Sequence, residues 1–152
     1  MAKKLEEIII SKEDAIFWLD NQGKWHIDSG EFKNKNMIDY FHSCIEKDKD
    51  GYYVTQTYNN KREKVYFHYE DTALFVFDVI EKNGLISVLN TKKRIKIKPK
   101  KLFLENENLY LKIGKEKAKF VDNGLVKLSK FLEYDDRFWI KIKNKKYPIR
   151  EF

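Results

Sequence analysis

The sequence predicts an α+β fold, in which a mainly antiparallel sheet carries two helices. Segments with strand-like alternation or a high content of β-branched and aromatic residues outnumber the two amphipathic helix patterns. The order strand, strand, helix, strand, strand also occurs twice along the chain. We therefore expect residues 1–152 to form one compact unit of two structural repeats, 15–69 and 101–152, joined by central strands in 70–100 that form a β-hairpin.

The first repeat begins with a predicted hairpin, in which residues 15–20 pair with 24–28 around a polar turn. Asn34 has the side chain expected of a helix N-cap. We expect a helix over 35–47, because the following apolar residues recur on one helical face: Met37, Ile38, Phe41, Cys44 and Ile45.

Two strands complete that repeat, one over 52–56 and one over 64–69. The second repeat has the same order, with a hairpin over 102–111 and Asp122 as the predicted N-cap of its helix. Leu125, Leu128, Phe131 and Leu132 form the apolar face of that helix. Strands over 137–142 and 145–149 follow.

The stretch from Tyr69 to Ile80 contains the longest apolar run in the chain. Both faces of a strand over 74–80 would be mostly apolar, which is typical of a central strand covered on each side. We expect Phe75 and Phe77 to make its core contacts. The Asn83-Gly84 pair predicts a hairpin turn directly after this strand.

The composition is that of a globular domain, with 42% hydrophobic and 15% aromatic residues. The net charge of +7 is carried mostly by lysine, since only four of the 31 basic residues are arginine. The single cysteine, Cys44, excludes an internal disulfide. We read neither a signal peptide nor a membrane-spanning run, so we expect a cytoplasmic protein without membrane insertion.

Three segments resemble the bacterial family called domain of unknown function 1285. They are 22–26 (Gln-Gly-Lys-Trp-His), 50–54 (Asp-Gly-Tyr-Tyr-Val) and 70–75 (Glu-Asp-Thr-Ala-Leu-Phe). The sequence departs from the family pattern at Gln22 and at Thr72-Ala73, where the family has Asp and Ala-Pro. The resemblance implies an α+β fold with a repeated motif and no established activity, and a conjectured role in signal transduction.

The acidic pair Glu70 and Asp71 precedes the central strand and lies within the resembling segments. One interpretation is a carboxylate site that binds a cation or a ligand amine. The other is a turn that orients the strand, in which Asp71 bonds to backbone amides. Trp25 and His26, from the first resembling segment, are the other two candidate ligand-binding residues.

A basic ribbon over 92–101 is the strongest charge feature. A phosphate-tracking surface would use its side chains together with two lysines of a later strand: Lys92, Lys93, Arg94, Lys96, Lys98, Lys141 and Lys143. The alternative is an edge strand that lysines protect from aggregation.

The three histidines, His26, His42 and His68, lack metal-ligand spacing, and we expect His42 on the surface. We predict no metal, no cofactor and no catalytic residue. The leading hypothesis is a non-catalytic module that binds a partner protein or a small-molecule ligand. The alternatives are a nucleic-acid-binding protein and, more weakly, an enzyme of another class, so enzymatic activity stays open. An uncovered strand would also allow a homodimer.

Overall fold

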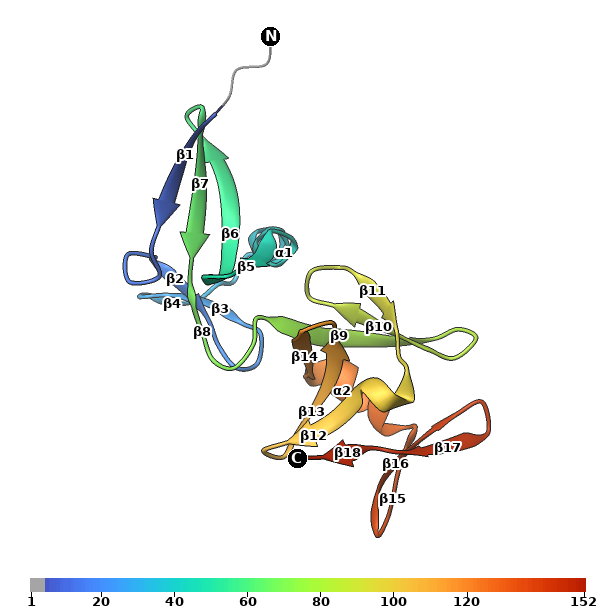
Figure 1. Ribbon diagram of the computed structural model, residues 1–152. Coiled ribbons are helices and arrows are strands. Elements are labelled where there is room, and N and C mark those ends of the chain that lie inside the picture. The colour runs from blue at the N-terminus through green and yellow to red at the C-terminus, as the bar shows by residue number, and fades with distance from the viewer. Residues whose placement is uncertain (1–4) are drawn as a thin grey trace. The chain divides into compact units, whose positions relative to one another are not determined.

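The computed structural model describes residues 5–152, and the chain divides into two compact units (Figure 1). Unit 1 ends at Ala73, and unit 2 begins at Leu74. Strands predominate and two α-helices are present, so the α+β class is confirmed. The predicted segment 15–69 lies in unit 1, and 101–152 lies in unit 2 together with most of the central strands.

Unit 1 has two four-stranded sheets, with the strand orders β1-β7-β6-β5 and β4-β3-β2-β8. Its elements are β1 (Glu6–Ile10), β2 (Phe17–Leu19), β3 (Trp25–Ile27), β4 (Gly30–Glu31), α1 (Lys35–Ser43), β5 (Ile45–Asp48), β6 (Gly51–Tyr58), β7 (Lys61–Tyr66) and β8 (His68–Tyr69). The predicted strand over 64–69 is interrupted at Phe67, where the chain leaves one sheet for the other.

Unit 2 has a seven-stranded sheet of order β11-β10-β9-β14-β13-β12-β18 and a three-stranded sheet of order β15-β16-β17. Its first elements are β9 (Leu74–Glu81), β10 (Leu85–Leu89), β11 (Arg94–Lys96), the 3-10 turn η1 (Pro99–Lys101), β12 (Leu102–Glu105), β13 (Asn108–Ile113) and β14 (Glu116–Phe120). The remaining ones are α2 (Asp122–Ser129), β15 (Leu132–Asp135), β16 (Arg137–Ile142), β17 (Lys145–Pro148) and β18 (Arg150–Glu151).

The predicted hairpins are present, and their turns have the expected chemistry. Three two-residue loops combine tight pairing with positive φ at both central residues: Asn59-Asn60, Asn106-Glu107 and Lys143-Asn144. This is the backbone of a type I′ turn, whose twist matches that of the flanking strands. The predicted Asn83-Gly84 turn likewise connects β9 to β10.

Helix α1 begins as predicted, because the side-chain oxygen of Asn34 accepts a hydrogen bond of 3.1 Å from the backbone N–H of Met37. It ends earlier than predicted, at Ser43. Ile45 is the first residue of β5, opposite Val54. An apolar pair at 44–45 fits the end of a helix and the start of a strand equally well, so periodicity alone could not place the boundary.

Helix α2 starts one residue earlier than predicted. Val121 holds the N-cap position without a side-chain cap, and Asp122 is the first helical residue. The helix lies on β9, and Gly124 makes the close approach possible (Figure 1). A Cβ at Gly124 would come within 2.1 Å of the carbonyl oxygen of Val76. The backbone therefore touches backbone at this point.

Strand β9 is interior, as predicted, with β10 on one side and β14 on the other. Phe75 and Val76, which point to opposite faces, are both fully buried. Phe77 is only half-buried, so of the two predicted core residues Phe75 is the one in the interior. Asn90 holds the strand by its side chain and its amide, which bond to the N–H and C=O of Phe75 at 3.0 and 2.9 Å.

Antiparallel pairs form the majority, as expected of a mainly antiparallel fold, but four pairs of strands are parallel. Parallel register occurs between β1 and β7, β2 and β8, β9 and β14, and β12 and β18. Each of these pairs joins segments far apart in the sequence. No turn connects such strands, so no local signal predicts their direction.

Several strands lie outside the predicted β-β-α-β-β order, among them β4, β5, β14 and β15. Helix α1 is directly preceded by β2, β3 and β4 and followed by β5, β6 and β7, and helix α2 is directly preceded by β12, β13 and β14 and followed by β15, β16 and β17. The helices pack less completely than predicted. Met37 is 49% exposed and Leu125 is 41% exposed, whereas Leu128 is fully buried.

Candidate functional site

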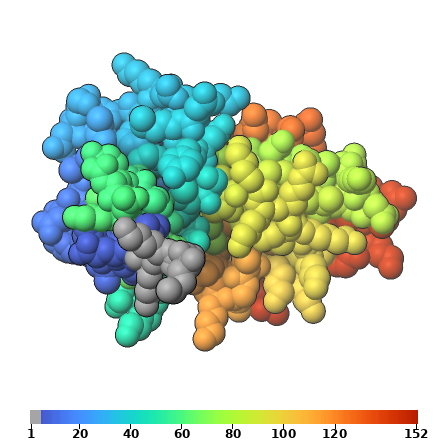
Figure 2. Space-filling model, turned by 90° about the horizontal axis from the view of Figure 1, so that it is seen from above, coloured from blue at the N-terminus to red at the C-terminus, as the bar shows by residue number. Residues whose placement is uncertain are grey.

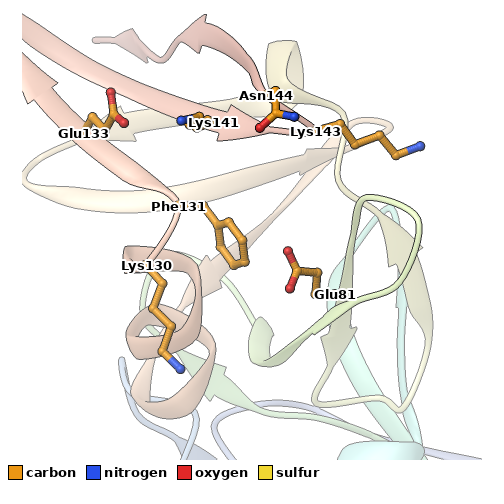
Figure 3. Close-up of a pocket in the computed structure, with 7 residues that line it drawn as sticks. All are labelled: Glu81, Lys130, Phe131, Glu133, Lys141, Lys143 and Asn144. Carbon is orange, nitrogen blue, oxygen red and sulfur yellow. The ribbon is translucent and has the colours of Figure 1, made fainter.

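A hollow of about 250 Å³ in unit 2 gathers the most charge of any site described below (Figure 3). Three stretches that are separate in the sequence converge on it. Its lining residues are Glu81, Lys130, Phe131, Glu133, Lys141, Lys143 and Asn144, and we call it the lysine hollow. The ring of Phe131 projects into the middle, and the carboxylate of Glu81 faces it (Figure 3).

Local structure explains how each lysine reaches the hollow. Lys130 is the C-cap residue of α2. Lys141 lies in β16, and the backbone N–H of Lys141 donates to the carbonyl of Phe131 at 2.8 Å. Lys143 occupies the type I′ turn after β16, at φ 51°, and donates from Nζ to Oδ1 of Asn83 at 2.6 Å.

Positive charge exceeds negative charge at this site. Three lysines line it against two glutamates. One of these carboxylates, that of Glu133, already has an ion pair of 3.3 Å with Lys146. Lys146 also lies directly opposite Lys141 in the β16–β17 ladder. Like charges that face each other across a ladder are unfavourable, and an anion bound between them would relieve the repulsion.

The basic ribbon is where the sequence placed it, on exposed backbone. Six of its side chains are exposed: Lys92, Lys93, Arg94, Lys96, Lys98 and Lys100. Strand β11 is an edge strand that pairs only with β10 among the residues 5–152. Figure 2 shows the yellow segment that contains these residues uncovered on the face in view.

The structure connects part of this ribbon to the lysine hollow. The side chain of Lys96 passes over Gly84, with its Cε 3.6 Å from the position of a Cβ at that glycine. Lys143 binds Asn83 in the same turn. Lys96 and Lys143 therefore both reach the β9–β10 turn, although they are far apart in the sequence.

The ring of Trp139 does not add an uncovered aromatic surface to the basic ribbon. Its indole N–H donates to the carbonyl of Asp135 at 3.1 Å. The guanidinium of Arg137 and the ammonium of Lys146 lie over its ring, at 5.9 and 5.2 Å from the centroid. These cations cover the surface on which a base would stack.

Glu70 and Asp71 are exposed and lie in a tight turn at the end of unit 1. The N–H of Thr72 donates to the carbonyl of Glu70, and Asp71 between them has φ 59°. A backbone bond across one residue with positive φ is the geometry of a γ-turn. No cluster of three or more metal-ligating side chains occurs in the part of the chain that the structure describes.

Trp25 and His26 have neighbours within the fold. Trp25 is 1% exposed and lies in the core of unit 1. His26 stacks on Trp18 at 4.2 Å, and its Nε2 is 2.7 Å from Oδ2 of Asp20. Burial raises the pKa of Asp20, but the bond from His26 and the backbone amides of Lys24 and Gln22 outweigh it and hold this pKa below its usual value.

His42 is buried, which corrects the surface position expected for it. Only 2% of it is exposed, and its Nδ1 accepts a hydrogen bond of 3.2 Å from the indole N–H of Trp25. Helical periodicity put His42 next to the apolar stripe. Periodicity could not reveal that the indole N–H of Trp25, in strand β3, needs a hydrogen-bond acceptor at this position.

A second hollow, of about 230 Å³, lies in unit 1 and includes the Asp50-Gly51-Tyr52 segment of the family resemblance. Its lining is mostly polar: Lys12, Asp50, Gly51, Tyr52, Tyr66, Phe67, His68 and Tyr69. Tyr52 and Tyr69 meet edge to face at 5.0 Å. This contact accounts for the two tyrosines as packing residues.

Sequence reasoning found Lys141 and Lys143 but missed the other residues of the lysine hollow. Lys130 was part of no predicted site, and Phe131 was predicted on the apolar face of the helix. Glu81 and Glu133 had no distinguishing context among 24 acidic residues. Only the packing of β16 against the end of α2 brings these side chains together.

Comparison with known proteins gives a match of structure alone. No family model and no curated protein sequence matches the chain. The crystal structure of a DUF1285 family protein from Silicibacter pomeroyi DSS-3 matches with a TM-score of 0.63 at 14% identity, over 95% of this chain and 84% of that one.

A DUF1285 family protein from Shewanella baltica OS155 matches with a TM-score of 0.49 at 16% identity, over 69% of this chain and 83% of that one. The first match carries the conclusion, because it covers both units. The chain therefore has a DUF1285-like fold, and the resemblance read from the sequence is confirmed at the level of the fold.

Proposed function

We propose that the protein is a non-catalytic binding module and that the lysine hollow of unit 2 binds a small anionic ligand. The observation that carries this proposal is that Lys130, Lys141 and Lys143 line one hollow together with Phe131. The volume of about 250 Å³ suits a compact ligand, such as one with a phosphate or carboxylate group next to an apolar part.

The lining of the hollow favours binding over catalysis. It contains no histidine, cysteine, serine or aspartate, so the usual pairing of a nucleophile with a histidine base is absent from its lining. Lysines at such a site attract and orient an anion as point charges.

A role in signal transduction and a cytoplasmic location stay predictions. No helix among residues 5–152 has the length and apolar character needed to cross a membrane.

The experiment is a calorimetric titration of the protein with inorganic pyrophosphate and with citrate at low ionic strength. We expect binding that Lys141→Gln weakens by about tenfold, the equivalent of losing about 1.4 kcal/mol of charge-assisted contact. Lys112→Gln is the matched control, because Lys112 is an exposed lysine of β13 outside the hollow. Equal weakening by both substitutions would show general charge attraction and contradict the proposal.

A second candidate function is nucleic-acid binding through the ribbon and the β9–β10 turn. Lys96 and Lys143 both reach this turn, so the basic segments that contain them lie next to each other. This arrangement favours nucleic-acid binding. Fluorescence anisotropy with a labelled single-stranded oligonucleotide tests this function. Affinity should fall steeply as salt rises, and Lys96→Gln should reduce the salt dependence by about 0.7 to 0.9 in slope. An absence of binding at low salt would exclude this function.

We also infer that the two units are copies of one structural motif. Strand register supports this: His68 of β8 lies opposite Trp18 of β2, and Arg150 of β18 lies opposite Phe103 of β12, both in parallel. The hairpins correspond as well, since Leu19 faces Trp25 and Leu104 faces Leu109. An aromatic stack occupies the same position in each, Trp18 on His26 and Phe103 on Tyr110.

The equivalence of the units has a direct test. Exchange of the β6–β7 turn, Asn59-Asn60, for the β16–β17 turn, Lys143-Asn144, should be tolerated in unit 1, because both adopt positive φ at both positions. A replacement with Val-Val is the control that should disrupt the hairpin. Circular dichroism and thermal unfolding report the outcome. Equal loss of structure in both variants would contradict the equivalence.

A further inference from the structure

Unit 2 contains an apolar hollow of about 180 Å³, separate from the lysine hollow. It lies between the β12–β13 hairpin, helix α2 and strands β15 and β16. Its lining residues are mostly aliphatic or aromatic: Leu104, Glu107, Asn108, Leu109, Phe120, Leu125, Leu132, Phe138 and Ile149. We call it the Leu109 hollow.

The Leu109 hollow has a buried floor and an open rim. Leu109, Phe120 and Ile149 are at most 5% exposed. On the rim, Leu125 and Phe138 are 41% and 38% exposed. Tyr134, itself 70% exposed, packs edge to face on Phe138 at 5.0 Å. Clustered exposed apolar side chains of this kind mark interaction sites more often than isolated ones do.

Unit 1 shows what fills the corresponding space there. Leu109 has the register position that Trp25 has in unit 1, opposite Leu104 and Leu19 respectively. The indole of Trp25 is 1% exposed and packs edge to face on Phe67, at 4.9 Å between centroids. A leucine is much smaller than this indole, so unit 2 leaves open a space that an aromatic side chain fills in unit 1. This step rests on the proposed equivalence of the two units.

Volume and charge specify the occupant. An apolar cavity of roughly 150 Å³ lined by Leu, Ile and Phe binds benzene, and the Leu109 hollow is of similar size and lining. Glu107 is its only charged lining residue. Phe138 follows Asp135 and Asp136, both exposed, and Arg137, whose guanidinium donates to the carbonyl of Ile149 at 3.1 Å, so two carboxylates stand against one cation on this side. A cation beside the aromatic ring would find complementary charge on this side.

We propose that the Leu109 hollow docks a tryptophan-sized aromatic side chain of a partner protein, flanked in that partner by a lysine or arginine. The ring would insert between Leu109 and Phe138, as Trp25 does against Phe67. The basic neighbour would lie near Glu107. An anchor of one aromatic ring in an apolar pocket with a charged rim is a common arrangement at protein interfaces.

The test uses three probes, the amides of N-acetyl-Trp-Lys, N-acetyl-Trp-Glu and N-acetyl-Leu-Lys. Each is titrated into the isotope-labelled full chain while amide shifts are followed by NMR. We expect saturable shifts around Leu109, Leu125 and Phe138, with millimolar affinity for Trp-Lys and about tenfold weaker binding of Leu-Lys. Trp-Glu should bind less tightly than Trp-Lys.

Two variants locate the site. Leu109→Trp fills the hollow from within and should abolish the shifts. Leu125→Asp changes the exposed rim, where folding is least at risk, and should weaken binding at least about tenfold. Val126→Asp is its matched control, because Val126 is exposed on α2 outside the hollow and should leave binding unchanged.

Three outcomes would overturn the proposal. One is equal affinity for Trp-Lys and Leu-Lys, which would remove the aromatic preference. Another is unchanged binding in Leu125→Asp. The third is concentration-dependent dimerisation in sedimentation experiments that Leu125→Asp abolishes, because the occupant would then be a second copy of the chain. None of these results bears on the lysine hollow, so the two proposals fail separately.

Discussion

Unit 1 and unit 2 each combine one helix with two sheets, but they fill their interiors with different side chains. The core of unit 1 is aromatic: Phe17, Trp25, Phe41 and Phe67 meet one another with centroid distances of 4.9 to 6.3 Å. The core of unit 2 is mainly aliphatic, with Leu102, Leu111, Leu128 and Ile140 fully or almost fully buried.

This difference shows that the topology tolerates either kind of core but that each kind has its own consequence. The large indole of Trp25 fills the space with a single side chain. Its polar N–H needs a hydrogen-bond acceptor, and Nδ1 of His42 provides it. Smaller aliphatic residues need no such acceptor, but they leave the Leu109 hollow open. Unit 1 is closed at this position, whereas unit 2 has an open hollow there, which we propose as a binding site.

The largest expected effect comes from removing the indole of unit 1. Trp25→Ala should destabilise unit 1 by about 3–5 kcal/mol, because it leaves a large cavity and an acceptor without its donor. Leu109→Ala is the matched change in unit 2, and its cost should lie near 2 kcal/mol, since the neighbouring space is already open. Urea unfolding followed by amide signals of each unit measures both. Equal costs would contradict the proposed difference between the cores.

The next largest effect concerns the helix of unit 2. Gly124→Ala should destabilise this unit by about 1–3 kcal/mol, because the added Cβ meets the carbonyl of Val76 and the helix must move away from β9. Met37→Ala, on the exposed face of α1, is the control and should change stability little. Thermal unfolding compares them. Unaltered stability in Gly124→Ala would show that α2 can shift without cost.

A pH-dependent contribution should distinguish unit 1 further. Hydrogen bonds from Lys64 and Tyr66 lower the pKa of Asp48 from its usual value to about 2. Because the folded pKa lies below the unfolded one, Asp48 stabilises the fold above about pH 4, and this contribution is lost as the pH falls toward 2.

Asp48→Asn should therefore reduce stability at pH 7 and make little difference near pH 2. Asp135→Asn is its counterpart, at the end of the corresponding strand β15 in unit 2. Urea unfolding at a series of pH values provides the comparison. A constant difference between wild type and Asp48→Asn across that series would show that the carboxylate charge is not what stabilises the unit.

The smallest expected effect concerns an exposed ion pair of unit 2. Lys127 of α2 lies 2.5 Å from Asp78 of β9, and both side chains are at least 40% exposed. Lys127→Ala should cost no more than about 1 kcal/mol, because solvent screens such pairs. Chemical denaturation in low and high salt measures it. A cost well above that value would mean that this pair, rather than the approach at Gly124, holds the helix on β9.

Some features of both units were predictable because they depend on local chemistry. Asn34 caps its helix, Asn83-Gly84 forms a turn, and the pair Asn59-Asn60 suits the positive φ of a type I′ turn. The interior position of β9 followed from two apolar faces. Each of these is decided by a few neighbouring residues, so the signal is present in any window of the sequence that contains them.

Other features needed residues from distant segments. The burial of His42 depends on Trp25, which lies 17 positions away. The parallel pairs join strands without a connecting turn, and the lysine hollow forms only because β16 packs beside the end of α2. No periodicity or spacing encodes such a meeting.

The sequence by itself determined the class of the fold, the order of most elements and the exposed basic ribbon, because alternation, caps and turn residues act locally. The tertiary structure decided which side chains meet. It brought Lys130, Lys141 and Lys143 into the lining of one hollow with Phe131, and it enclosed Trp25 while leaving the space beside Leu109 open. The physical reason is that packing depends on the volume of all neighbours at once, and these come from every part of a unit.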